Sequence, residues 1–370
     1  MEQSKVYFSD LRTDEISTLG KLKRLMKEAG FEQIDFKDKF VAVKIHFGEP
    51  GNMAYLRPNW AKVVCDYVKE LGGKPFLTDS NTLYVGGRAN ALDHLDSAML
   101  NGYTPLQTGV QCIIADGIKG TDYDLVPIRG GKYLRAAKIG RAIMDADIII
   151  SLSHAKGHIA AGFGGALKNL GMGSGSRAGK MDMHGSGKPS VNQKRCIGCG
   201  KCAQNCAHGA PHIENGKCTI LQAKCTGCGR CVGVCPVEAI YSPDCANDVL
   251  NCKIAEYAKA VCDGRPNFHI ALALDISPEC DCHGYSDVPV VPNVGMFASF
   301  DPVALDVACA DAINAQPVNP GSALADAHDH DHDHDHDHFH AIHPDTNWRA
   351  AVEHGAAIGL GSTEYELVKI

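Results

Sequence analysis

The sequence predicts an α/β fold with a mainly parallel sheet, helices on both faces of that sheet, and an inserted cysteine-rich module. Two observations lead to this prediction. Short apolar runs alternate with amphipathic helical stretches along most of the 370 residues, which is the pattern of parallel strands joined by helices. A dense group of cysteines between residues 196 and 235 interrupts the alternation.

The first part of the core, residues 1–189, contributes most of the expected elements. Apolar runs that end in polar turns predict four strands, at 40–47, 74–80, 111–117 and 146–154. Amphipathic stretches between them predict four helices, at 14–30, 57–71, 87–101 and 131–145. The second helix begins at Arg57-Pro58, and proline is well suited to the first position of a helix. Glycine and serine dominate from Gly162 to Gly187, which predicts loops.

The second part of the core, residues 244–370, resumes the α/β pattern after the insert at 190–243. It is expected to contain two helices and two strands, at 247–262, 268–277, 295–299 and 302–315. The core is therefore expected to be discontinuous, with the insert leaving and re-entering it at neighbouring points.

Composition and charge exclude several classes of protein. The net charge of −7 comes from 36 basic and 43 acidic residues, so the chain lacks the basic footprint of a nucleic-acid-binding protein. No run of apolar residues is long enough to span a membrane, and the first residues do not resemble a secretion signal. We therefore expect a cytoplasmic protein without a membrane partner. In that compartment its 17 cysteines are expected to be metal or catalytic ligands rather than disulfides.

The cysteine spacing predicts two 4Fe–4S clusters. Cysteines separated by two, two and three residues occur twice, and a proline, Pro236, follows the second copy. Three closely spaced thiolates surround one cluster, and the fourth ligates the other cluster. One cluster is then held by Cys196, Cys199, Cys202 and Cys235, and the other by Cys225, Cys228, Cys231 and Cys206. A pair of zinc sites is the alternative, but zinc sites favour CxxC pairs separated by a longer loop. The stretch resembles bacterial-type two-cluster ferredoxins, with Ala207 in place of the first proline.

Polar side chains follow the predicted strands and indicate a second site. In open parallel sheets ligands bind beyond the carboxyl ends of the strands. The residues found there are Lys44, His46, Asp79, His154, Lys156, His158, Lys168, Cys280 and Cys282. Taken singly, several polar residues have simpler explanations: Asp79 can cap a turn, Asp301 can cap a helix, and His94 can be a core or surface histidine.

Cys280 and Cys282 leave several alternatives open. On an extended segment they would face the same side, where they could hold a metal or a third cluster, or act as a redox dithiol, or remain two buried thiols. The glycines from 162 to 175 could wrap an anion, with Lys168 as a point charge. The core is thus expected to hold an additional metal or an unidentified ligand.

An Asp/His tract covers residues 328–340, and its low complexity predicts a loop. Its histidines are His328, His330, His332, His334, His336, His338 and His340. Imidazole and carboxylate ligands suit nickel, zinc or iron(II), so the tract is either a loose metal-binding loop or a solvated segment.

Several long strings together resemble the domain-of-unknown-function 362 family, in the form that carries an inserted ferredoxin module. They are KIHFGEPGN, FLTDSNTLYVGGR, SHAKGHIAAGFGGALKNLGMG, SPECDCHGYSDVPVVPNVGMFASFDPVALD and GLGSTEYELVKI. The resemblance implies an iron–sulfur-binding protein of anaerobes. It also implies a distant similarity in fold to the nickel-pincer lactate racemases, whose site histidines and lysines would correspond here to His46, His154, His158 and Lys168.

Two functions compete at this point. The first is an iron–sulfur oxidoreductase that moves electrons between a redox partner, protein or small molecule, and a ligand in the strand-end cleft. The second is a metal-handling or cofactor-assembly protein that uses the Asp/His tract and the histidines and cysteines at the strand ends.

Overall fold

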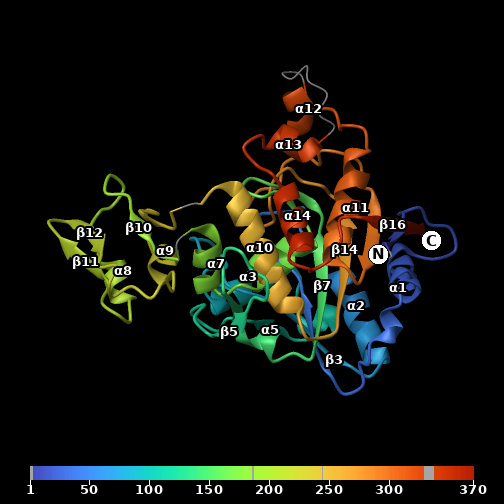
Figure 1. Ribbon diagram of the computed structural model, residues 1–370, viewed down its shortest axis with the longest axis horizontal. Helices are drawn as coiled ribbons and strands as arrows, with labels where there is room; N and C mark the ends of the chain where they lie inside the picture. The colour runs from blue at the N-terminus through green and yellow to red at the C-terminus, as the bar shows by residue number, and fades with distance from the viewer. Residues whose placement is uncertain (1–2, 186, 244, 329–336) are drawn as a thin grey trace.

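The computed structural model describes residues 3–185, 187–243, 245–328 and 337–370. Its centre is a sheet with the strand order β16-β1-β15-β14-β7-β2-β3-β4 (Figure 1). The strands are β1 (Ser4–Ser9), β2 (Phe40–Lys44), β3 (Lys74–Asp79), β4 (Cys112–Ile114), β7 (Ile148–His154), β14 (Asn267–Ala273), β15 (Gly295–Ser299) and β16 (Tyr365–Lys369). Among these strands β15 runs antiparallel to both neighbours and the other pairings are parallel, so the prediction of a mainly parallel sheet is confirmed.

Helices cover both faces of the sheet because the central strands are apolar on both sides. In β7, Ile148, Ile150 and Leu152 face one core and Ile149 faces the other. One face is covered by α1 (Thr18–Glu28), α2 (Pro58–Glu70) and α3 (Ala91–Leu100). The opposite face is covered by α6 (Ala166–Ser174), α10 (Asn247–Cys262), α11 (Pro302–Asn314) and α14 (Arg349–Ala357). Short elements complete this body: η1 (Phe31–Gln33), α4 (Pro105–Thr108), α5 (Arg141–Met144), β5 (Tyr123–Pro127), β6 (Ala136–Gly140), β8 (Lys156–His158) and β9 (Gly162–Gly164).

Two predictions of secondary structure in the first part of the core were wrong. The glycine-rich segment from 162 to 187 was expected to be loop, but it contains α6 and a further helix, α7 (Arg177–His184). Its glycines permit close packing: a Cβ added at Gly171 would lie 2.1 Å from the carbonyl oxygen of Ile254 on α10. The predicted helix at 131–145 is instead β6 followed by the single turn α5, because Ala137 and Ile139 are buried with the two-residue period of a strand.

The insert, residues 190–243, lies beside the sheet body and projects from it (Figure 1). It contains β10 (Ser190–Val191), α8 (Lys201–Gln204), β11 (Pro211–Glu214), β12 (Lys217–Ile220), α9 (Arg230–Gly233) and β13 (Ile240–Tyr241). The strands β10 and β13 pair antiparallel, so the chain enters and leaves the insert at one place. We call this segment the cysteine module.

The Asp/His tract is not loop along its whole length. His328 ends α12 (Ala323–His328), and α13 (His338–Ile342) begins within the tract. Asp337 caps α13 by accepting hydrogen bonds from the backbone N–H groups of Phe339 and His340. The prediction of a loop was therefore wrong for residues 338–340. His330, His332, His334 and His336 lie outside the described residues.

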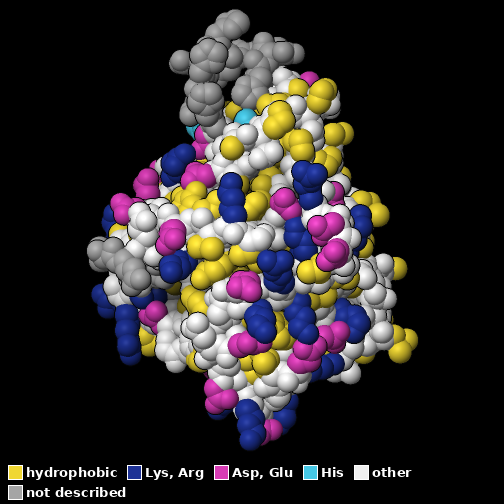
Figure 2. Space-filling view, turned by 90° about the vertical axis from the view of Figure 1, so that its right-hand side faces the viewer, with side chains coloured by type: hydrophobic (Ala, Val, Ile, Leu, Met, Phe, Trp, Pro, Cys, Tyr) yellow, Lys and Arg dark blue, Asp and Glu magenta, His cyan; other side chains and the backbone are white. Residues whose placement is uncertain are grey.

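The surface near the two chain ends carries both signs of charge. Figure 2 shows lysines and arginines interspersed with aspartates and glutamates on this face. In the described part of the chain, every helix is too short or too polar to cross a bilayer.

Candidate functional site

The carboxyl ends of β2, β3 and β7 open into a cavity of about 360 Å³. These strands are parallel and adjacent, so Lys44, Asp79 and His154 are brought to one edge of the sheet. All the second-site residues predicted from the sequence line this cavity, except Cys280, which lies directly behind its wall. Five cationic side chains and two carboxylates are in the lining: Lys44, Arg88, Lys156, Lys168 and Lys180, and Asp79 and Asp281. The excess of cations favours an anionic ligand.

Lys44 forms the floor of the cavity. Its Nζ lies 2.9 Å from Asp79 Oδ1 and donates a hydrogen bond to Asn169 Oδ1 at 2.8 Å. Burial lowers the pKa of Lys44, and Asp79 opposes this shift. Burial would raise the pKa of Asp79, but Lys44 and the nearby histidines hold it well below the ordinary value. A Cβ at Gly173 would lie 2.5 Å from Lys44 Nζ, so α6 has room for this lysine only because residue 173 is glycine.

Asp79 also has contacts on the opposite side. Arg88 Nη1 lies 3.8 Å from Asp79 Oδ2, and Arg88 Nε donates to Glu49 Oε2 at 2.7 Å. His94 is fully buried, with Nε2 3.6 Å from Asp79 Oδ2, in agreement with the reading of His94 as a core histidine. Asp79 is therefore part of a buried charge network and does more than cap a turn.

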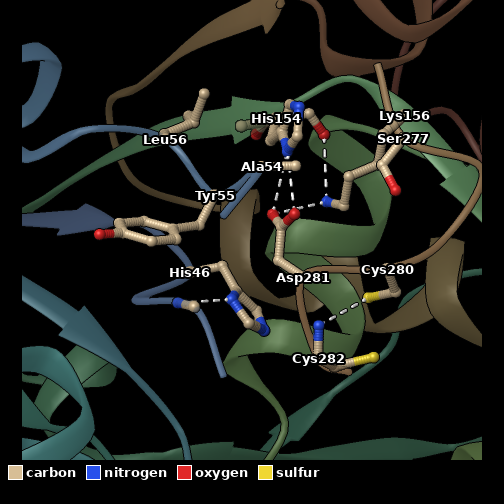
Figure 3. Close-up of polar contacts among 12 residues, drawn as sticks. His46, Ala54, Tyr55, Leu56, His154, Lys156, Ser277, Cys280, Asp281 and Cys282 are labelled. Carbon is tan, nitrogen blue, oxygen red and sulfur yellow. Dashed lines mark hydrogen bonds and ion pairs between the residues drawn. The ribbon is translucent and has the colours of Figure 1, made fainter. Parts of the chain in front are cut away.

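His154, Asp281 and Lys156 form a buried group at the end of β7 (Figure 3). His154 Nδ1 lies 3.0 Å from Asp281 Oδ1, and His154 Nε2 lies 2.6 Å from the carbonyl oxygen of Leu274. Both partners can only accept, so each ring nitrogen of His154 faces a hydrogen-bond acceptor. Lys156 Nζ lies 3.0 Å from Asp281 Oδ2. Burial would raise the pKa of Asp281, but His154 and Lys156 hold it below its ordinary value.

His46 has a defined tautomer. Its Nδ1 accepts a hydrogen bond from the backbone N–H of Gly48 at 3.0 Å, so the neutral ring carries its proton on Nε2. Burial, with the nearby Arg88, lowers the pKa of His46 well below its ordinary value. The ring therefore presents an N–H donor. In this arrangement both ring nitrogens of His154 and Nδ1 of His46 are already engaged in hydrogen bonds within the protein.

His158, Cys280 and Cys282 are the described side chains that come close enough to share one metal ion, with ligand atoms within 4.8 Å of one another. Cys280 is fully buried, and its sulfur lies 3.4 Å from Lys168 Nζ. Cys282 lines the cavity. The pair does not lie on an extended segment as expected, because His283 N–H donates to the carbonyl of Cys280 at 3.0 Å and closes a turn.

Three cavity residues were missed from the sequence. Asn169 donates to the carbonyl oxygens of Lys44 and Leu152 and so ties α6 to two strand ends. Lys180 and His184 lie on α7 and line the cavity, and burial lowers the pKa of Lys180 to about 8. The glycines of this segment predict a loop, and a loop prediction does not give the helical spacing by which Lys180 and His184 both line the cavity.

The cysteine module contains two small cavities of about 20 Å³ each. One is lined by Cys196, Cys199, Cys202 and Cys235, together with Cys218, and the other by Cys206, Cys225, Cys228 and Cys231. The structure thus groups the eight motif cysteines in the same two sets of four as the crossed spacing, with Cys218 as a fifth cysteine at the first cavity. Backbone N–H groups point at the sulfurs: Ala210 N–H donates to Cys206 at 3.4 Å, and Ala239 N–H to Cys235 at 3.2 Å. Such donors suit thiolates that ligate a cluster.

The module packs against the wall of the large cavity. Leu83 and Met181 of the sheet body share a buried cluster with Val232 of the module. Leu83 also lines the cavity, so its side chain contacts both the cavity and the module. Arg177 lies beside Gly229 and Gly233 of the module, and the charges of Cys228 and Cys231 act on it.

Part of the chain is similar to a curated protein. The Thylakoid-associated protein sll1697 of Synechocystis sp. is 31% identical over 127 residues, which are 33% of this chain and 34% of that protein. The chain thus spans about a third of the length of this curated relative.

Two solved structures align at 12% identity and a TM-score of 0.35, each covering 51% of the known chain. They are the lactate racemase apoprotein from Thermoanaerobacterium thermosaccharolyticum and a structural-genomics protein from Thermotoga maritima, which cover 74% and 72% of this chain. A family model matches residues 41–311, and the chain therefore belongs to the family described as Domain of unknown function (DUF362).

Proposed function

We propose that this protein is an iron–sulfur oxidoreductase in which two 4Fe–4S clusters exchange electrons with an anionic ligand in the strand-end cavity. The observation that carries the proposal is the position of Leu83, which packs on the cysteine module and also lines the cavity. Clusters held in the module would supply one-electron chemistry one side chain away from the ligand.

The cysteine geometry supports clusters over zinc. Four thiolates on one zinc ion lie close together, about 2.3 Å from the metal. Among the described residues, a convergence of three ligand atoms within 4.8 Å is found at His158, Cys280 and Cys282 and not in the module. The module cysteines instead surround their two cavities, as a larger inorganic core requires.

The sheet body would bind and orient the ligand. Lys180 has a lowered pKa of about 8 and lies in the cavity wall, where an anion would stabilise its charged form. His46 presents Nε2–H as a hydrogen-bond donor. The His154–Asp281–Lys156 group is already saturated and would hold the cavity rim in place.

Anaerobic purification with iron, sulfide and EPR analysis tests the clusters. We expect about eight iron atoms per chain. Cys206→Ala should remove the cluster held by Cys225, Cys228 and Cys231 and leave the other in place. Cys309→Ala, in a buried core cysteine, is the matched control and should keep both. A folded chain that carries only zinc, or loss of the other cluster in Cys206→Ala, contradicts the proposal.

The second candidate function is metal handling, favoured by the convergence of His158, Cys280 and Cys282. Its test is a deletion, and the structure limits which residues can be removed. Asp337 Oδ2 accepts from Trp348 Nε1 at 2.7 Å, and Phe339 is fully buried. We therefore propose to delete residues 329–336, which leaves Asp337 and Phe339 in place. If the metal-handling function is correct, the deletion variant should bind less nickel or zinc than the wild type.

A further inference from the structure

The turn that follows β14 places two sulfurs side by side. Cys280 and Cys282 occupy the first and third positions of the turn closed by His283 N–H, and their sulfur atoms lie within 4.8 Å of each other. A disulfide needs a sulfur separation of about 2.0 Å, which side-chain rotation across one turn can supply. Cys280 is fully buried, whereas Cys282 lines the cavity.

The surroundings of Cys280 are those of a thiolate. Lys168 Nζ lies 3.4 Å from its sulfur, and the backbone N–H of Cys282 donates to the same sulfur at 3.4 Å. A hydrogen bond from the Cys282 thiol lowers the pKa of Cys280 well below its ordinary value, against the effect of burial, and Lys168 and His158 add to the shift. The same hydrogen bond raises the pKa of Cys282. The lysine and the backbone N–H beside its sulfur therefore favour the thiolate at Cys280 rather than at Cys282.

His158 completes this environment as a donor. Its Nδ1 accepts hydrogen bonds from the backbone N–H groups of Ala160 and Ala161, each at 3.0 Å. The neutral ring then carries its proton on Nε2, and burial lowers the pKa of His158 to about 4, so the ring is neutral at pH 7. A metal ligand needs a free ring lone pair, and both nitrogens of this ring are already engaged. The arrangement thus favours a hydrogen-bonded thiolate over a metal site.

We propose that Cys280 and Cys282 are a redox-active dithiol that forms a reversible disulfide and stores two electrons between the clusters and the cavity. On oxidation the S–H bond of Cys282 breaks, an S–S bond forms with Cys280, one proton leaves through the cavity, and one electron passes to each of the two clusters. Reduction reverses each step. This inference rests on the proposed function for its electron acceptors, but the disulfide itself does not require them.

One segment of the chain joins the two partners of this exchange. Leu83 packs on the cysteine module, and five residues later Arg88 Nη2 lies 3.5 Å from the carbonyl oxygen of Cys282. Residues 83–88 therefore contact both the module and the turn that carries the dithiol.

A thiol-trapping redox titration of the full chain tests the disulfide. Samples poised anaerobically at a series of potentials are denatured, alkylated and mapped by peptide mass spectrometry. We expect Cys280 and Cys282 to lose alkylation together, with a two-electron slope and a cross-linked peptide. Cys65 and Cys309, which are buried single thiols, should stay fully alkylated. The wild-type chain suffices, so this result does not depend on a variant that folds.

Two variants test the role of the lysine. Lys168→Met removes the cation beside Cys280, so disulfide formation at pH 7 should slow at least tenfold. Lys259→Met is the control, because Lys259 is also a lysine with little solvent exposure but pairs with Asp263 outside the cavity. The second variant is Cys206→Ala. With reduced methyl viologen as electron donor, its Cys280–Cys282 disulfide should be reduced to the two thiols at least tenfold more slowly than that of the wild type.

The possible failures are distinguishable. Cys280 and Cys282 that stay alkylated at every potential overturn the dithiol, even if the clusters are present. A stoichiometric metal that is lost in Cys280→Ser also overturns it, in favour of a metal site. A disulfide that forms in a chain without iron leaves the dithiol standing and overturns the proposed cluster function alone.

Discussion

Asp281 is the residue on which the rim of the cavity depends. Its carboxylate is almost fully buried between the His154 ring and Lys156 Nζ. Because Asp281 lies inside the turn between the two cysteines, this charge group also fixes where the turn sits relative to β7. The geometry of the dithiol is thus set by electrostatics at the neighbouring position.

Removing this carboxylate should be costly. Asp281→Ala leaves the buried Lys156 without its counter-charge and the buried His154 Nδ1 without its partner, and we expect a loss of about 3–5 kcal/mol in the free energy of unfolding. Urea unfolding at pH 7 measures it. Asp263→Ala breaks the more exposed pair with Lys259 and should cost at most about 1 kcal/mol. Equal effects of the two substitutions would show that the buried group does not hold the rim.

Sequence alone could place these residues but not assign their chemistry. Lys44, Asp79 and His154 were expected to meet because parallel strands end at one edge of the sheet, and the structure brings them together. The state of His154 depends on Asp281 and on the Leu274 carbonyl, which lie more than a hundred residues away in the chain. No local pattern predicts that both ring nitrogens would face acceptors.

At the scale of elements, strands were predicted better than the helix that completes the site. Apolar runs with β-branched residues identify β2, β3, β7, β14 and β15 because these strands are buried on both faces. Glycine lowers helix propensity, so α6 resembled a loop. Tertiary packing reverses that preference, since Gly171 and Gly173 allow α10 and Lys44 to approach α6 closely.

The strand β14 offers a test of burial through pH. His269 is fully buried, its Nδ1 lies 3.0 Å from Ser151 Oγ, and burial lowers its pKa to about 3. In the unfolded chain the His269 ring binds a proton below about pH 6.5, whereas in the folded protein it stays neutral to a lower pH. The contribution of His269 to the free energy of unfolding is therefore fully present above about pH 6.5 and is lost as the pH falls toward 3.

His269→Gln should remove this dependence. Each pH unit in the window corresponds to about 1.4 kcal/mol, so between pH 7 and pH 5 the wild type should lose about 2 kcal/mol more than the variant. Urea unfolding at the two pH values measures the difference. His212→Gln, in an exposed histidine of β11, should retain the wild-type dependence. An unchanged slope in His269→Gln would mean that His269 is charged in the folded protein.

At the scale of the whole molecule, the large cavity and the cysteine module are neighbours that share the side chain of Leu83. The cavity lies at the carboxyl edge of the sheet, and the cysteine module packs on that edge through Val232, Leu83 and Met181. The module leaves the core soon after the glycine-rich segment, and this connection predicts that it docks near the same edge. The residues that make the contact were not predictable, since Leu83 is nearly a hundred and fifty positions from Val232.

Docking can be weakened selectively. Val232→Asp places a charge in the shared apolar cluster and should release the module from the sheet body while the sheet stays folded. We expect faster proteolysis near the two ends of the module and a separate, earlier calorimetric transition. Ile197→Asp, in an exposed residue of the same module, should behave as the wild type. A single unchanged transition in Val232→Asp would contradict the proposed contact.

The pairing of β10 with β13 has a consequence for how such a protein can evolve. The strands by which the chain enters and leaves the module are paired, so the module is connected to the sheet body through one two-stranded ribbon. A module attached in this way can be gained, lost or exchanged without rethreading the sheet. The cavity edge and the cysteine module are then inherited as separable parts, and only the patch around Leu83 has to match any module that replaces this one.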